Sequence, residues 1–251
     1  MMFELDVRLQ QLLASQRYPF MFVTVSGAHL YGFPSPNSDW DLRGVHVLPP
    51  KELLGLNKPE ETIEYSGDLD GLEADLVTHE ANKFFKLLLK PNGYVLEQLM
   101  SPLVVHSTAE HAAVKGLFRQ LITRYHAHHY LGFADTQWRL FEKETPRRVK
   151  PLLYVYRVLL TGIHLMRAGE LEANLVNLNA VFKLSQIDDL VQRKLSGEEK
   201  QTLENVDLAF HEREFRRLVA DLELSRDATF LPEKPSCQSA LNDLLLSLRG
   251  L

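Results

Sequence analysis

A short apolar run that ends at a glycine, with two aspartates at i and i+2 a little further on, constrains this chain more than any other feature. Residues 21–25 form the run, Gly27 follows it, and Asp39 and Asp41 come after a short polar excursion. In an extended strand alternate side chains share a face, so both aspartates are expected on one side and Trp40 on the other. The sequence therefore predicts two strands that bring a glycine turn close to a pair of carboxylates.

The periodicity of apolar residues predicts an α+β fold. Strands are expected at residues 21–25, 42–48, 61–65 and 75–78, and helices at 80–90 and 94–100. Strand signals then disappear, and amphipathic helices are expected at residues 109–129, 130–144, 150–168, 197–224 and 238–248. Ser196 and Glu199 have capping-box spacing at the start of the fourth of these. We therefore predict an α/β domain with a mixed sheet at residues 1–105 and a helical domain at residues 106–251.

Composition excludes several classes of protein. The formal net charge of −5 argues against a surface that binds nucleic acid by bulk positive charge, although it leaves room for a local basic groove. Cys237 is the only cysteine in the sequence, which excludes an intramolecular disulfide and a zinc ribbon and suits a reducing compartment. The longest apolar stretch, residues 151–166, is interrupted by Arg157 and is too short to span a bilayer. With no secretory signal apparent, we expect a cytoplasmic protein that does not contact a membrane.

Asp39 and Asp41 are the strongest candidate catalytic residues. Two carboxylates on one face of a strand can share divalent cations, and Mg²⁺ or Mn²⁺ held there would activate a hydroxyl and neutralise a pyrophosphate leaving group. A third carboxylate is expected from a neighbouring strand. Asp75, which begins a predicted strand, is favoured over Glu73 and Glu80. The alternative is a polar turn that opens a strand, with the aspartates solvated.

Phosphate binding is expected around the glycine turn. Gly27 allows close approach of the β- and γ-phosphates of a nucleotide, with the backbone N–H of Ala28 donating. An ordinary tight turn would need the glycine equally. Ser26 and Ser38 are candidate hydroxyl donors to the same phosphates. Arg43 either contacts a phosphate or pairs with a carboxylate and holds the strand in place, and the sequence leaves both roles open.

Further candidates for nucleotide binding lie in the helix expected at residues 150–168. Lys150, Tyr154 and Arg157 fall on one side of that helix at roughly i, i+4 and i+7. This stripe is suited to binding a triphosphate, stacking a base or holding an acceptor. The alternative for Tyr154 is a core residue with a polar tip.

Three histidines lie close together in the helical half: His126, His128 and His129. No cysteine pair lies near them in the sequence to complete a zinc site. We therefore expect these three histidines to lie at the surface or between domains rather than to bind a metal.

The glycine turn and the aspartates resemble the signature of the DNA polymerase β-like nucleotidyltransferase superfamily, in which an apolar-Gly-small turn precedes an Asp-apolar-Asp-apolar strand. Residues 27–32, 38–45 and 83–88 are similar to one bacterial branch, the predicted nucleotidyltransferases found beside RNA ligase genes. The likeness covers the first part of the chain well and the helical remainder loosely. The family usually has a serine where this chain has Ala28.

The resemblance implies an N-terminal polymerase β-like nucleotidyltransferase domain and a helical domain that closes over its cleft. It implies Mg²⁺-dependent or Mn²⁺-dependent transfer of NMP from an NTP to an acceptor hydroxyl, with an RNA end or a tRNA as acceptor, in RNA repair or processing. Asp39, Asp41 and Asp75 would hold the metal. Two rivals stay open: a protein or small-molecule acceptor, and a nucleotide-binding or RNA-binding module that has lost catalysis, which Ala28 suggests.

Overall fold

The computed structural model describes residues 5–196 and 207–251, and contacts divide them into two compact units. The first unit comprises the described residues up to Leu30, together with Asp39–Leu121 and Pro235–Leu251. The second comprises Tyr31–Ser38 and the described residues of Ile122–Lys234. This division differs from the predicted boundary at residue 105, because residues 106–121 and the C-terminal helix belong with the sheet.

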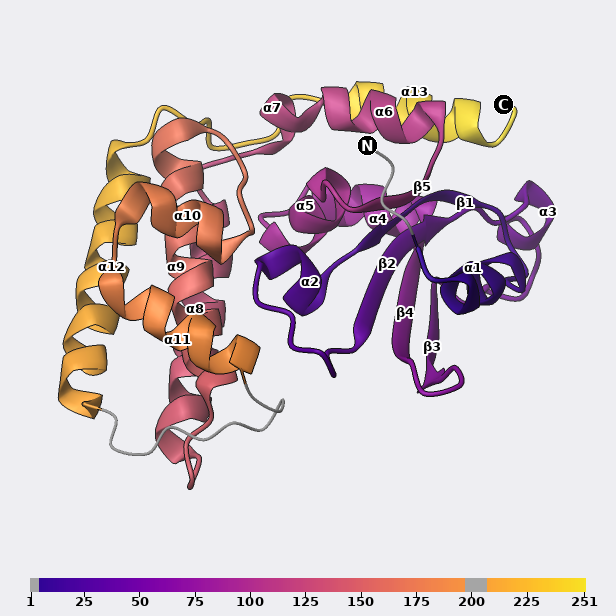
Figure 1. The fold of residues 1–251 in the computed structure, drawn as a ribbon. Coiled ribbons are helices and arrows are strands. Elements are labelled where there is room, and N and C mark those ends of the chain that lie inside the picture. Colours follow the sequence, from indigo (N-terminus) through magenta and orange to yellow (C-terminus); the bar gives the residue numbers. More distant parts are fainter. Residues whose placement is uncertain (1–4, 197–206) are drawn as a thin grey trace. The chain divides into compact units, whose positions relative to one another are not determined.

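The first unit is built on a sheet that, in the described residues, has five strands in the order β3-β4-β2-β1-β5 (Figure 1). β2 and β4 run parallel, whereas the other neighbouring pairs are antiparallel, so the sheet is mixed as predicted. The strands span Phe20–Val25 (β1), Trp40–His46 (β2), Thr62–Asp68 (β3), Glu73–Glu80 (β4) and Val104–Ser107 (β5).

Helices cover both faces of this sheet. On one face Leu9 of α1 packs in a buried cluster with Val25 and Leu42 of the two central strands. On the other face the ring of Phe22 meets Phe84 of α4 edge-on, with 5.4 Å between centroids. The first-unit helices span Val7–Ala14 (α1), Gly27–Tyr31 (α2, whose last residue falls in the second unit), Pro50–Leu53 (α3), Ala81–Leu88 (α4), Gly93–Met100 (α5), Ala109–Gly116 (α6), Phe118–Leu121 (α7) and Gln238–Leu248 (α13).

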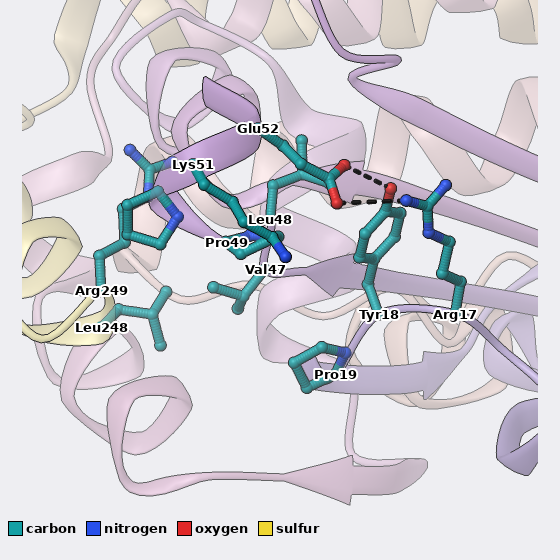
Figure 2. Close-up of a pocket in the computed structure, with 11 residues that line it drawn as sticks. Arg17, Tyr18, Pro19, Val47, Leu48, Pro49, Lys51, Glu52, Leu248 and Arg249 are labelled. Atoms are coloured by element: carbon teal, nitrogen blue, oxygen red, sulfur yellow. Dashed lines mark hydrogen bonds and ion pairs between the residues drawn. The ribbon is translucent and has the colours of Figure 1, made fainter. Parts of the chain in front are cut away.

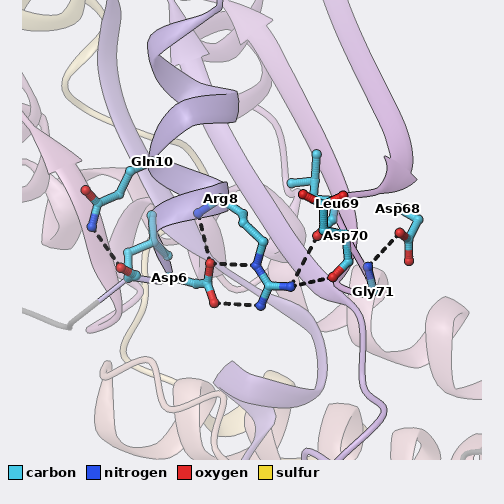
Figure 3. Close-up of polar contacts among 8 residues, drawn as sticks. Asp6, Arg8, Gln10, Asp68, Leu69, Asp70 and Gly71 are labelled. Atoms are coloured by element: carbon cyan, nitrogen blue, oxygen red, sulfur yellow. Dashed lines mark hydrogen bonds and ion pairs between the residues drawn. The ribbon is translucent and has the colours of Figure 1, made fainter.

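Hydrogen bonds from Arg8 connect α1 to the β3–β4 turn (Figure 3). Its guanidinium donates to both carboxylate oxygens of Asp6, at 2.8 and 2.9 Å, and Nη1 donates to the carbonyl oxygens of Leu69 and Asp70. The Asp6 carboxylate also accepts from the backbone N–H of Arg8 and so caps the helix. These bonds, above all those from the Arg8 side chain, lower the pKa of Asp6 to about 2.

The second unit is helical, with α9 at its centre (Figure 1). α9 is apolar around most of its circumference, which is typical of a helix buried on all sides, and the other helices of the unit pack on it. Gly169 ends α9 in the left-handed conformation, with φ of 66°. The helices span His126–Lys143 (α8), Val149–Ala168 (α9), Leu175–Phe182 (α10), Ser185–Ser196 (α11) and Leu208–Ala228 (α12).

Some predicted elements differ from the structure. The helix expected at residues 109–129 is broken into α6, α7 and the start of α8. Ser196, the first residue of the expected capping box, is the last residue of α11, whereas Glu199 and the start of the helix expected at 197–224 lie outside the described residues. α12 begins at Leu208 and runs past the expected end. Of the three histidines expected at a surface or between domains, His128 is exposed, whereas His126 is fully buried and bonds Thr123, so the surface alternative is wrong for His126.

Among the described residues, no helix is both long and apolar enough to cross a membrane.

Candidate active site

Asp41 and Asp75 lie side by side on adjacent parallel strands. Asp41 is the second residue of β2, and its Cα is paired in register with Asp75 of β4. Trp40 and Leu42, the neighbours of Asp41 along the strand, pack with the buried cluster around α1 on the other face, as the alternation predicts. Two strands that start at the same edge of the sheet therefore bring two carboxylates together.

Gly27 makes room for the carboxylate of Asp41. The strand β1 ends at Val25, and the backbone N–H of Ser26 donates to the carbonyl oxygen of Asp41 at 2.8 Å. Gly27 then turns the chain with φ of 60°, and a Cβ built on it would lie 2.7 Å from Cγ of Asp41 and closer still to Oδ2. A side chain at this position would collide with the carboxylate. The contact with Asp41 therefore requires glycine here, in addition to the positive φ.

Arg43 binds both aspartates through one nitrogen. Its Nη2 donates to Oδ1 of Asp41 at 2.8 Å and to Oδ2 of Asp75 at 2.9 Å. Nη1 donates to the carbonyl oxygens of Leu42 and Asp75, and Nε donates to the Tyr94 hydroxyl at 2.6 Å. All five N–H donors of the guanidinium are thus engaged. Contact with a phosphate, one of the two roles left open by the sequence, would require one of these bonds to break.

The charge of Arg43 is stabilised in this setting. Burial disfavours the charged guanidinium, but Tyr94, Asp41 and Asp75 outweigh that penalty and hold the pKa of Arg43 above its ordinary value. The guanidinium therefore stays charged, and its positive charge offsets the repulsion between the carboxylates of Asp41 and Asp75.

Tyr94 is a site residue that the sequence did not reveal. It lies in the first turn of α5, which Asn92 caps by accepting from the Tyr94 backbone N–H at 3.1 Å. The sequence predicts the helix. The Tyr94 hydroxyl, however, bonds Arg43, which is far away in the sequence, and no local pattern encodes such a contact.

Asp39 precedes the first residue of β2 and carries a buried oxygen. Its Oδ1 has no hydrogen-bond partner among the described residues. The following residue, Trp40, stacks on His29 of α2 with 4.1 Å between ring centroids, which fixes the path of the chain here. A buried carboxylate oxygen without a donor is costly unless a cation or water meets it.

A metal fits the donor set chemically. Three carboxylates supply the hard oxygen ligands that Mg²⁺ and Mn²⁺ favour, and the unpaired Oδ1 of Asp39 suits such a cation. As the residues lie, no group of three or more His, Cys, Asp or Glu side chains in the described part of the chain is arranged to hold a metal ion. One carboxylate oxygen of Asp41 and one of Asp75 already accept hydrogen bonds from Arg43.

Of the two rivals to Asp75, Glu80 is engaged elsewhere. Its side chain is almost completely buried, accepts from the backbone N–H of Asn82 at the start of α4, and pairs with Arg249 at 2.6 Å. Glu73 begins β4 and is exposed. Asp75 is the carboxylate that shares Arg43 with Asp41.

The remaining candidates near the glycine turn differ in their surroundings. Ser26 and Ala28 are both buried. Ser38 lies in a turn, where its Oγ accepts from the Ser35 backbone N–H at 2.9 Å and lies 3.0 Å from the Ser35 hydroxyl. A serine in place of Ala28 would set its hydroxyl in a largely buried position.

Tyr154 and Arg157 pack within the second unit. The guanidinium of Arg157, which is 3% exposed, lies 3.7 Å from the centroid of the Tyr31 ring. Tyr154 meets Tyr31 and Phe33 edge-on. Lys150 lies one turn earlier on α9 and is partly exposed. Tyr154 and Arg157 therefore pack against the segment Tyr31–Ser38, which in sequence lies between the glycine turn and Asp39.

The chain is similar to several known proteins. A model of the RNA repair pathway DNA polymerase beta family matches residues 1–247. The chain is 38% identical over 158 residues to MJ0002, an uncharacterized protein of Methanocaldococcus jannaschii, and the match spans 61% of this chain and 63% of that relative. It is 27% identical over 251 residues to YcgL, an uncharacterized protein of Bacillus subtilis, covering 95% and 93% of the two chains. A nucleotidyltransferase-like protein from Exiguobacterium sibiricum, known from a crystal structure, covers 96% of this chain and 77% of its own, with 12% identity and a TM-score of 0.33.

Proposed function

Because the chain belongs to the RNA repair pathway DNA polymerase beta family, we propose that it transfers a nucleoside monophosphate from an NTP to an acceptor hydroxyl, with release of pyrophosphate. Family membership supports nucleotidyl transfer in general.

The observation that carries the proposal is the placement of Asp41. One oxygen of its carboxylate is held by Arg43, and the other is directed at the backbone of Gly27. The glycine turn therefore lies against one carboxylate of the pair, that of Asp41, and this neighbourhood suits a site that binds both phosphate and a cation.

Asp39, Asp41 and Asp75 would hold Mg²⁺ or Mn²⁺. When bound, such cations lower the pKa of the attacking hydroxyl and neutralise the charge that gathers on the leaving pyrophosphate. The unpaired buried oxygen of Asp39 and the all-oxygen donor set support this assignment.

The other residues of the turn position the nucleotide. Gly27 allows close approach of the phosphates, the backbone N–H of Ala28 donates to them, and Ser26 and Ser38 supply further hydroxyls. Asp75 accepts the proton of the acceptor hydroxyl. Arg43 acts on the carboxylates by fixing their orientation.

Lys150, Tyr154 and Arg157 on α9 are further proposed nucleotide-binding residues. For the acceptor we favour an RNA end, because the family is described by its part in an RNA repair pathway. Such a reaction belongs in the cytoplasm, where the free, buried thiol of Cys237 would stay reduced.

Label transfer tests this function directly. The full chain is incubated with each α-labelled NTP, Mg²⁺ or Mn²⁺, and separate RNA, tRNA and protein acceptors. We expect label on RNA and none without a divalent cation. Label on protein alone would favour the rival acceptor, and NTP binding without any transfer would favour a module that has lost catalysis.

A further inference from the structure

The first unit contains a pocket (Figure 2). Neither Asp41 nor Asp75 is among the residues that line it. It has a volume of about 520 Å³ and opens where β1 begins and β2 ends, with α3 and the residues at the end of α13 around it. Asp41 is near the start of β2, and the pocket begins at Val47, just after its last residue. At about 3.3 Å per residue along a strand, the two places are roughly 20 Å apart.

One wall of this pocket is apolar and rigid. Pro19, Pro49 and Leu248 contribute to it, and Tyr18 stands beside them. The Tyr18 ring stacks on the buried ring of His46 at 5.7 Å, and its hydroxyl donates to Glu52 at 2.7 Å (Figure 2). A wall held in this way needs no ordering when a ligand binds, which favours affinity.

The polar residues of the pocket are mainly cationic. Arg17, Lys51 and Arg249 line it, against one carboxylate, that of Glu52. Glu52 is already engaged, because it accepts from Arg17 at 3.2 Å and from Tyr18. In a chain with a net charge of −5, this is a local concentration of positive charge.

Two of these cations have donors without an acceptor among the described residues. Nη2 of Arg249 pairs with the buried Glu80 at 2.6 Å, but Nε of Arg249 is buried and has no acceptor among the described residues. Lys51 is exposed at the same pocket, and the structure gives its ammonium group no ion pair among those residues. A buried cationic donor without an acceptor calls for an anion or a water molecule.

We propose that this pocket binds a phosphate monoester whose body carries a flat ring with apolar faces, as in a nucleoside monophosphate or the 5′-terminal nucleotide of an RNA strand. Lys51 and Arg249 contact the phosphate, and the Tyr18–proline wall contacts the body. The volume lies within the range of small-molecule sites. The proposal does not depend on catalysis at Asp41.

Calorimetric titration of the full chain with AMP tests the proposal, with a chelator present so that no divalent cation is bound. We expect saturable binding of AMP, and binding of adenosine and of inorganic phosphate that is at least about tenfold weaker, because each lacks half of the ligand. Oligoribonucleotides with a 5′-phosphate or a 5′-hydroxyl form the second arm. Equal affinity for AMP and the phosphorylated strand identifies a free nucleotide as sufficient, and tighter binding of the strand identifies an RNA end.

Lys51→Ala should weaken AMP binding about tenfold or more, and the side chain is exposed, so folding is preserved. Lys58→Ala is the matched control, since it removes the same charge from an exposed lysine outside the pocket. Asp41→Asn should leave AMP binding unchanged. Equal losses in both lysine variants, loss in Asp41→Asn, or no saturable binding of either phosphorylated ligand would overturn the proposal.

Discussion

At the scale of single residues, Gly27 is the position where one methyl group should matter most. Gly27→Ala places a Cβ against the Asp41 carboxylate in a backbone conformation with φ of 60°. We expect nucleotidyl transfer to fall by at least about a hundredfold, because small displacements of catalytic groups have effects of this size. Initial rates and thermal melts measure the two consequences.

Gly71→Ala is the matched control for Gly27→Ala. Gly71 also has a positive φ, 82°, but a Cβ there would meet nothing within 4 Å. Gly71→Ala should lower the free energy of unfolding by the backbone strain alone, about 1–2 kcal/mol, and should retain activity. If both variants lost activity equally, the contact with Asp41 would not be the reason for the glycine.

Arg43 and Tyr94 should control cation affinity without touching the cation. Lysine in place of Arg43 cannot make five hydrogen bonds, and Tyr94→Phe removes the one to Nε. Loss of such an outer partner typically weakens metal binding by about 10–100-fold. Titration with Mn²⁺, with the free ion followed by electron paramagnetic resonance, measures this loss without reference to turnover.

Arg8→Lys is the control, because Arg8 also binds a carboxylate and two backbone carbonyls but lies at the β3–β4 turn. It should leave Mn²⁺ affinity unchanged. Tighter binding of Mn²⁺ to Arg43→Lys would instead mean that Arg43 competes with the cation.

How much of the site the sequence could predict depends on the range of each contact. The pairing of Asp41 with a carboxylate on a neighbouring strand could be predicted, since strand alternation and the order of elements are local patterns. The role of Arg43 could not, because an arginine beside two aspartates suits either a phosphate or a carboxylate. Tyr94 was missed since its partner lies on a distant strand.

At the scale of elements, the C-terminal helix α13 is tied to the sheet by a buried ion pair between Arg249 and Glu80. Glu80 is 1% exposed, so Arg249→Met would leave a buried carboxylate without a cation. We expect the free energy of unfolding to fall by about 3–5 kcal/mol, measured by urea denaturation.

The exposed pair Arg216–Glu212 on α12 provides the comparison. Arg216→Met should cost no more than about 1 kcal/mol. The double variant Glu80→Gln with Arg249→Met should be less destabilised than Arg249→Met alone. If the two arginine variants cost the same, the Arg249 pair is not buried in solution.

Among the elements, strongly periodic segments were predicted best. The strands at 21–25 and 75–78 and the helix at 238–248 correspond to β1, β4 and α13. The elements α1, β5, α10 and α11 were not predicted. α1, β5 and α10 have at most eight residues each, which carry too little periodicity to stand out, whereas the length of α11, twelve residues, does not explain its omission. The helix expected at 109–129 is broken into shorter helices in the structure. The spacing of apolar residues does not predict these breaks, because they depend on tertiary contacts.

At the scale of the whole molecule, buried histidines should make both units sensitive to acid. Burial lowers the pKa of His46 in the first unit to about 4 and that of His126 in the second to about 4. In the unfolded chain histidine titrates near pH 6.5, so between these values only the unfolded chain takes up the proton. Stability should therefore fall as the pH drops from about 6.5 to about 4, by up to about 1.4 kcal/mol per pH unit for each histidine.

Melting temperatures between pH 7.5 and 4 measure this loss. His126→Asn keeps an acceptor for the Thr123 backbone N–H and should reduce the pH dependence. His128→Asn, which changes an exposed histidine two positions away, should leave it unchanged. Identical profiles for the two variants would contradict the assignment to buried His126.

The central claim is that Asp41 and Asp75 form a centre for nucleotidyl transfer, and pyrophosphate release in single-site variants tests it most directly. Asp41→Asn removes a charge from that centre, whereas Asp68→Asn removes one from the exposed β3–β4 turn. We expect release by the wild type and by Asp68→Asn, and a loss of about a thousandfold or more in Asp41→Asn. Release by Asp41→Asn at the wild-type rate would contradict it.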